Sequence, residues 1–265
     1  MLKKLYKHEF YSLFRTLWPI YIMLAGLAII SRISFLFNTD NIFISFIQGT
    51  STTLYVFSIF GLFIVGEVII VVRFYKHLLS HEGYLTFTLP FTATQHLVCK
   101  LVCGVVIMIL NVLAVICSLL ILALEPGLIE EMFSALGEVW REIVRTNSTG
   151  TVILITIQIL LFIFITSITA LLMFYVSMAI GQQFKNRIAA SVVSYICIYA
   201  ALQMISSIII MPIMIVNIDA FENFMMSGIS AVQIVLAAIT LYQLILGTTY
   251  FLITRHMLTK KLNLE

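Results

Sequence analysis

Charge is scarce in this 265-residue sequence: Asp, Glu, Lys and Arg make up only 10% of it, whereas hydrophobic residues make up 62%. The mean hydropathy is +1.11. A typical soluble domain carries about 25% charged residues, and this chain has too few to cover a surface in water. The composition therefore excludes a soluble globular domain and indicates a protein embedded in lipid.

Catalytic motifs are also missing. His77 and His81 lie one helical turn apart and Glu82 follows them, but the metalloprotease pattern H-E-x-x-H is absent. Ser230 follows a glycine at position 228, yet the second glycine of an intramembrane serine motif and a histidine base within a span are lacking. The sequence therefore predicts no catalytic residue, and we expect a chain that is not an enzyme.

The four cysteines, Cys99, Cys103, Cys117 and Cys197, lie in or beside apolar runs and not in the predicted outer loops. This placement does not suggest the disulfide framework of an exported domain. No histidine or further cysteine joins them at zinc spacing, so we expect small packing residues and no metal site. A basic patch with interleaved aromatic residues is missing too, which argues against a nucleic-acid partner.

Six long apolar runs are what the sequence does contain. They cover residues 16–37, 52–72, 101–124, 152–178, 188–210 and 230–253. Each has about 20 residues or more, and at about 1.5 Å per residue a helix of that length crosses a hydrocarbon layer about 30 Å thick. Helices are expected because every backbone N–H and C=O must be paired inside lipid. The sequence thus predicts an all-α polytopic membrane protein with six transmembrane helices, the fifth ending near Pro212.

Basic residues give the predicted orientation. Of the 15 Lys and Arg residues, only Arg32, Arg141 and Arg145 fall on one side. The others gather on the opposite side, at Lys3, Lys4, Lys7, Arg15, Arg73, Lys76, Lys100, Lys185, Arg187, Arg255, Lys260 and Lys261. Because positively charged loops stay inside, we expect a multi-pass cell-membrane protein with both termini cytoplasmic. The first run is too long for a signal peptide and no small-residue cleavage site follows it.

Two further segments have helical amphipathic patterns. In residues 1–15 the apolar side chains share one face and the basic side chains lie off it. We interpret this segment as a cytoplasmic interfacial helix ahead of a six-span domain at 16–265, although a simple basic anchor would look the same. A second amphipathic helix is predicted at about 128–146 in the outer loop, where it rests on the membrane or contacts a partner.

The predicted cytoplasmic loop 73–100 is the most distinctive stretch. Gly83 interrupts it, and Pro90 stops any helix that precedes it. Thr92 and Gln95 have the spacing of a capping box, which predicts that the next helix begins there. Apolar residues such as Tyr84 need cover in the cytoplasm, from a protein partner or from the lipid interface.

The segment Ser80-His-Glu-Gly-Tyr-Leu-Thr-Phe-Thr-Leu-Pro90 within this loop resembles the first cytoplasmic loop of bacterial ABC transporter permeases, in the exporter-type class with six spans. In that class the loop docks on the ATPase subunit. The resemblance implies a coupling contact at His81, Glu82, Gly83, Tyr84 and Leu85. The loop 181–187 matches the position of a second coupling element, which would include Phe184 and Lys185.

The same resemblance implies the partners. No G-x-x-x-x-G-K-[ST] phosphate loop occurs in the sequence, so ATP and Mg would belong to a separate ABC ATPase subunit and this chain would hold no cofactor. A second copy, or a related permease, would complete a dimer surrounded by membrane lipid. The expected function is the permease subunit of an ATP-driven exporter. The alternative is an ATPase-independent channel or a membrane immunity or assembly factor, although no selectivity-filter-like run is present.

Polar residues within the spans are the candidates for a translocation path. They are Glu67, Asn111, Tyr195, Tyr199 and Gln203. An ionised acid near a helix centre costs on the order of 3 kcal/mol on insertion scales, so Glu67 should face the protein interior. Each of these residues either contacts cargo or only joins neighbouring helices. The apolar spans favour an amphipathic or hydrophobic cargo, such as a peptide, lipid or drug.

Overall fold

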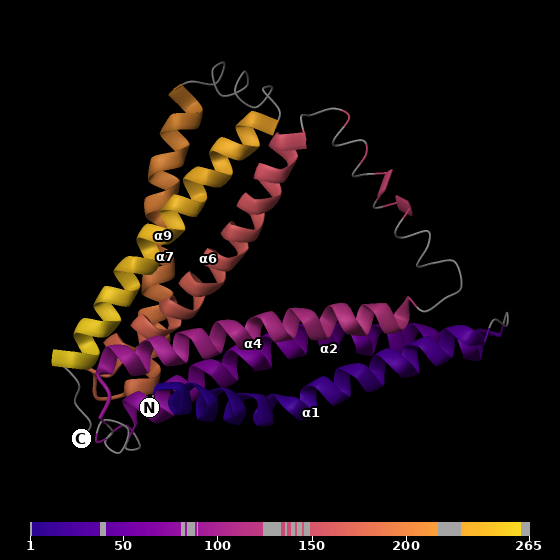
Figure 1. The fold of residues 1–265 in the computed structure, drawn as a ribbon, viewed down its shortest axis with the longest axis horizontal. Helices are drawn as coiled ribbons and strands as arrows, with labels where there is room; N and C mark the ends of the chain where they lie inside the picture. The colour runs from indigo at the N-terminus through magenta and orange to yellow at the C-terminus, as the bar shows by residue number, and fades with distance from the viewer. Residues whose placement is uncertain are drawn as a thin grey trace. The chain divides into compact units, whose positions relative to one another are not determined.

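The computed structural model describes residues 2–37, 41–80, 83, 88, 90–123, 134–135, 137–138, 141, 145, 149–216 and 229–260. Its long elements are the helices α1 (Leu2–Leu36), α2 (Ile42–Phe74), α4 (Ala93–Leu122), α6 (Thr149–Gly181), α7 (Arg187–Val216) and α9 (Ile229–Lys260) (Figure 1). These regions supply 6 helices long and apolar enough to cross a membrane. The predicted all-α, six-span fold is confirmed, and the chain is a multi-pass membrane protein.

Several helices continue beyond the apolar runs that predicted them. Residues 2–15 are helical and lead into the first span as part of α1, which also continues through Pro19. The prediction that the fifth helix ends near Pro212 is wrong, because α7 runs on to Val216. Proline removes only one backbone donor, and membrane helices tolerate it where the freed carbonyl is satisfied nearby. Hydropathy marks the lipid-embedded part of a helix and not the end of its hydrogen-bonded backbone.

The chain divides into two compact units. The first unit comprises Met1–Arg73 and Val102–Ser148, and so contains α1, most of α2 and most of α4. Leu24 and Ala28 of α1 form its core with Tyr55 and Leu62 of α2. Partly buried apolar residues of α4, among them Val115, pack against this cluster.

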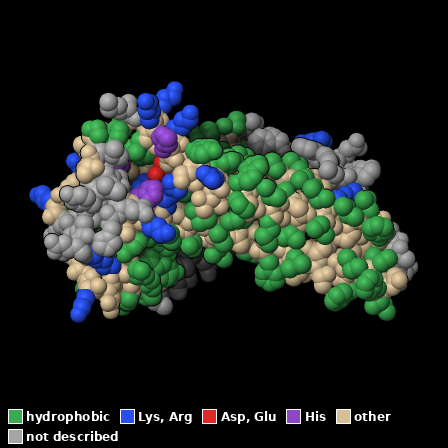
Figure 2. Space-filling model, turned by 90° about the horizontal axis from the view of Figure 1, so that it is seen from below, with side chains coloured by type: hydrophobic (Ala, Val, Ile, Leu, Met, Phe, Trp, Pro, Cys, Tyr) green, Lys and Arg blue, Asp and Glu red, His purple; other side chains and the backbone are tan. Residues whose placement is uncertain are grey.

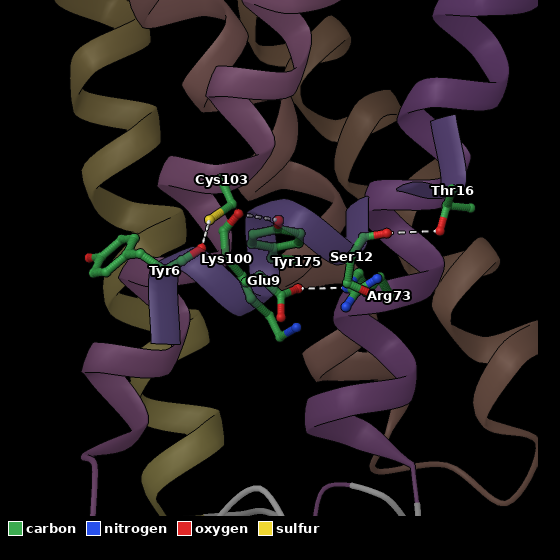
Figure 3. A network of polar contacts seen from close by, with 8 residues as sticks. All are labelled: Tyr6, Glu9, Ser12, Thr16, Arg73, Lys100, Cys103 and Tyr175. Carbon is green, nitrogen blue, oxygen red and sulfur yellow. Dashed lines mark hydrogen bonds and ion pairs between the residues drawn. The ribbon is translucent and has the colours of Figure 1, made fainter. Parts of the chain in front are cut away.

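The N-terminal part of α1 is tied to the other helices of the first unit (Figure 3). The Arg73 Nε–H donates to Glu9 Oε1 at 2.9 Å, and the two side chains are only 16% and 10% exposed. The Cys103 thiol lies 3.8 Å from the Tyr6 carbonyl oxygen. Residues 6–9 of the predicted interfacial helix are therefore held by α2 and α4. Its position at a lipid surface stays a prediction.

The second unit comprises Phe74–Leu101 and Thr149–Glu265. Within it, α6 packs against both α7 and α9 (Figure 1). Gly247 of α9 allows one of these contacts, since a Cβ there would lie 3.0 Å from Thr169 Oγ1 of α6. Small residues let membrane helices approach closely, because lipid tails are as apolar as the helices and packing must supply the attraction.

Large apolar side chains stay exposed along every long helix, and Figure 2 shows them spread over much of the face in view. Examples are Met23, Phe60, Ile109, Leu160, Val193 and Ile245. A soluble protein rarely exposes so large a contiguous apolar area. The distribution fits helices whose outer faces meet lipid tails.

Candidate functional site

The two ends of the predicted cytoplasmic loop 73–100 meet at one residue of α6. The rings of Phe74 and Tyr175 stack with centroids 3.8 Å apart and planes 7° from parallel. The Tyr175 hydroxyl donates to the Lys100 carbonyl oxygen at 3.5 Å (Figure 3). Tyr175 is fully buried. The loop is thus anchored within the second unit, at a residue that sequence reasoning did not single out.

The described parts of this loop are compact. After α2 the chain makes a π-helical turn, Tyr75–Leu79, a local form that is often found at functional sites. Gly83 is buried, and its N–H donates to the Ser80 carbonyl at 2.7 Å. Four of the predicted coupling residues lie outside the described residues, namely His81, Glu82, Tyr84 and Leu85.

The predicted capping box at the end of the loop is confirmed. The Thr92 N–H donates to Gln95 Oε1 at 3.0 Å, and the Gln95 N–H donates to Thr92 Oγ1 at 3.3 Å. These bonds satisfy donors that have no partner in the first turn of a helix. They fix the start of α4 at Ala93.

The second predicted coupling element, at 181–187, is a tight turn between α6 and α7. A Cβ at Gly181 would overlap Ser191, including its backbone N and Cα at 2.5 and 2.7 Å, so only glycine fits this close approach. Gln183 Nε2 donates to Met257 Sδ of α9 at 2.9 Å. Phe184 is 57% exposed and Lys185 is also exposed, so the turn presents an aromatic ring beside a cation.

A cavity of about 270 Å³ lies among α6, α7 and α9 in the second unit. Its lining is rich in hydroxyl and amide groups, which come from Thr166, Thr169, Tyr199, Gln203, Ser206, Tyr242, Gln243 and Tyr250. Apolar side chains complete it, from Ala170, Met173, Leu202 and Leu246. It lies within three helices that are apolar enough to span a membrane, where polar groups are rare and tend to mark functional sites.

The hydroxyl groups of this lining differ in their hydrogen bonding. Thr169 Oγ1 shares its one hydrogen between the Ile165 and Gln243 carbonyls, and Ser206 Oγ donates to the Gln203 carbonyl. By contrast, Thr166 Oγ1 and Tyr250 Oη are buried and have no hydrogen-bond partner in the described parts of the chain. Burying a hydroxyl without a partner costs about 1–3 kcal/mol.

Only two of the five predicted path residues line the cavity. Tyr199 and Gln203 line the cavity. Tyr195 does not, and its ring stacks instead on Phe174 of α6, with centroids 4.7 Å apart and planes 10° from parallel. Glu67 and Asn111 belong to the first unit.

Asn111 is a buried link between helices. Its Oδ1 accepts a hydrogen bond of 2.7 Å from the Tyr21 hydroxyl, which joins α4 to α1. On α2, a Cβ at Gly66 would lie 2.5 Å from Asn111 Nδ2, so glycine makes room for the amide. This geometry matches the structural alternative for Asn111, that of a polar contact between spans.

Glu67 is half-buried on α2. Arg73, the next basic residue along the chain, pairs with Glu9 and not with Glu67. Across the residues that the structure describes, the Glu67 carboxyl has neither a hydrogen bond nor an ion pair. Its role in a path stays a prediction.

Sequence reasoning missed half of the cavity's polar lining. Thr166, Thr169, Tyr242 and Tyr250 were not singled out, although a signal existed. Polar residues recur at helical spacing in each contributing span, as in the pairs Thr166–Thr169 and Tyr242–Tyr250. Such spacing indicates a polar face on each helix, but it does not show that the three faces meet.

Basic side chains gather at one end of the second unit. Lys76 and Lys100 lie in or beside the first loop, Lys185 in the turn 181–187, and Arg255 and Lys260 at the end of α9, which contacts that turn through Met257. Among the residues that the structure describes, no group of three or more His, Cys, Asp or Glu could hold a metal ion. No family model, curated protein or solved structure matches the chain.

Proposed function

We propose that this protein is the transmembrane permease subunit of an ATP-driven ABC exporter and that a separate ATPase chain docks on its cytoplasmic loops. One observation carries the proposal: both candidate docking loops and the polar cavity belong to the same compact unit. A movement of either loop would therefore move the helices that line the cavity. Movement of packed helices by rigid docking is a known mode of switching.

The contacts of the loops support this arrangement. Tyr175 of α6 holds both ends of the first loop, and the bond from Gln183 to Met257 joins the second loop to α9. The basic residues at this end of the unit agree with a cytoplasmic position, because Lys and Arg are enriched in inside loops. A second copy or a related permease would complete the assembly, with both termini in the cytoplasm.

The first experiment is affinity purification of the full chain from its native membranes in mild detergent, followed by mass spectrometry. We expect a stoichiometric partner that carries a G-x-x-x-x-G-K-[ST] phosphate loop. Purification of a homo-oligomer with no such chain would contradict the proposal and would favour an ATPase-independent channel or a membrane immunity or assembly factor.

A pair of variants tests the docking surface. Phe184→Ala combined with Lys185→Ala should lower ATPase recovery on the order of tenfold, because exposed aromatic and charged anchors often carry about 1.4 kcal/mol or more of binding. The matched control is Phe43→Ala, since Phe43 is 69% exposed in the predicted outer end of α2. Glu82→Ala combined with Tyr84→Ala tests the first loop in the same way, with membrane insertion unchanged.

A further inference from the structure

Tyr250 of α9 brings a buried hydroxyl to the lining of the cavity. Its side chain lines the cavity, yet the residue is only 6% exposed, and its hydroxyl has no hydrogen-bond partner among the described residues. Thr166 brings a second buried hydroxyl without a partner to the same cavity. Two buried hydroxyls without partners on different helices raise the free energy of the folded protein unless a bound molecule forms hydrogen bonds with them. Together with the other hydroxyl and amide groups of the lining, they suit a ligand that carries hydrogen-bonding groups.

The charge of that ligand follows from the lining. The lining contains hydroxyls, amides and apolar side chains but no Asp, Glu, Lys, Arg or His. A charged group buried among these side chains needs a counter-charge, because the apolar surroundings do not screen it. Ions and phospholipid headgroups are thus poor occupants, and the ligand group that enters should be neutral.

The donor and acceptor pattern narrows the class further. Gln203 and Gln243 each offer an amide, which both donates and accepts. A peptide bond has the complementary pair of groups, whereas a hydrocarbon chain has neither. Met173, Leu202 and Leu246 supply apolar contacts beside these amides. This combination suits a molecule with an apolar body and neutral amide groups.

We propose that the cavity among α6, α7 and α9 binds a segment of an uncharged, apolar peptide through its backbone amides. The proposal deepens the transport function and rests on it, because a peptide bound there would be the cargo. The cavity, at about 270 Å³, is slightly smaller than drug-sized pockets of about 300–1,000 Å³ and suits one or two residues. Tyr199 is 58% exposed, so it lies where the remainder of the peptide would leave the cavity.

The test uses the full chain in lipid nanodiscs without an ATPase. The probe is an N-acetylated, C-amidated tetraleucine in which one residue is a photoreactive diazirine leucine. Competitors are the unlabelled peptide, the same peptide methylated at every backbone amide nitrogen, and hexadecane. We expect saturable labelling of α6, α7 and α9, strong competition by the parent peptide, and competition at least tenfold weaker by the other two.

Variants link binding to the hydroxyls. Tyr250→Phe and, separately, Thr166→Val should each weaken the apparent affinity roughly two- to tenfold, the range for the loss of one hydrogen bond. Tyr11→Phe is the matched control, since Tyr11 is 64% exposed on α1 and should leave labelling unchanged. Labelling that neither variant weakens, or equal competition by hexadecane, would overturn the proposal in favour of an unspecific apolar site.

The two proposals fail separately. If an ATPase co-purifies but the peptide does not bind, the exporter function stands and the cargo is another class of molecule. If the peptide binds as expected and no ATPase is found, the site stands and the coupling is wrong.

Discussion

The two units of this protein use polar side chains within the membrane in different ways. In the first unit several pair with each other across helices, Tyr21 with Asn111 at 2.7 Å and Tyr55 with Ser118 at 2.8 Å, alongside a bond of 3.0 Å from Gln48 Nε2 to the Ser34 carbonyl oxygen. In the second unit they reach backbone carbonyls, as when Gln158 Nε2 donates to the Gln233 oxygen at 2.8 Å. Among the described residues, buried hydroxyls without a hydrogen-bond partner occur in both units, at Ser31 of the first and at Thr166 and Tyr250 of the second.

This difference has a mechanical meaning. A hydrogen bond between two side chains forms only when those two residues face each other. Such bonds therefore hold the helices of the first unit in one register. A backbone carbonyl is offered at every residue of a helix, so a bond to it needs no particular side chain on the other side. The first unit therefore suits a rigid support, and the second suits helices that adjust around a ligand.

The largest effect should come from filling the space at Gly181. Gly181→Val places side-chain atoms against the backbone of Ser191, which cannot move aside without shifting the start of α7. We expect a loss of about 3 kcal/mol in the free energy of unfolding, at the upper end for overpacking. Thermal denaturation of the purified protein measures it.

Gly150→Ala is the matched control in the same helix, because nothing lies within 4 Å of a Cβ at that position. Equal melting temperatures for Gly181→Val and Gly150→Ala would show that the turn between α6 and α7 is not closely packed.

Two tyrosine substitutions compare the units directly. Tyr21→Phe leaves the buried Asn111 oxygen without its donor and should cost about 1–2 kcal/mol of stability. Tyr250→Phe removes a hydroxyl that has no described partner, so stability should stay the same or rise. Unfolding by SDS in mixed micelles gives both values. An equal loss in the two variants would contradict the difference between the units.

The smallest effect concerns the coupling between paired residues. A double-mutant cycle of Tyr55→Phe and Ser118→Ala should give an interaction energy of about 0.6 kcal/mol, the average for such bonds in a membrane protein. In the second unit, Gln158→Leu and Gln233→Leu should be additive, because each side chain bonds to a backbone oxygen that the other substitution leaves in place. The same SDS titration measures both cycles. A strong interaction energy between Gln158 and Gln233 would contradict the difference between the two units.

Sequence reasoning located the six helices because a lipid-spanning segment must be long and apolar. It also located the start of α4, because the capping box of Thr92 and Gln95 is a local signal. It placed Tyr199 and Gln203 on one helical face, and both line the cavity.

The remaining contacts join residues that are far apart in the chain. Tyr175 looks like any aromatic residue of an apolar run until Phe74 and Lys100 are seen against it. Likewise, nothing near Asn111 in the sequence points to Tyr21 as its partner. Periodicity identifies a face of a helix, but tertiary packing decides which residue meets that face.

The capping box has a consequence for insertions and deletions. A helix is a screw, so adding one residue turns everything beyond it by about 100° and advances it by about 1.5 Å. Because the cap sets the origin of α4 at Thr92, the loop before it can change in length without rotating Asn111. A single-residue deletion between Gln95 and Asn111 would instead turn the amide away from Tyr21. A change in the length of the loop therefore leaves the phase of the span behind it unaltered.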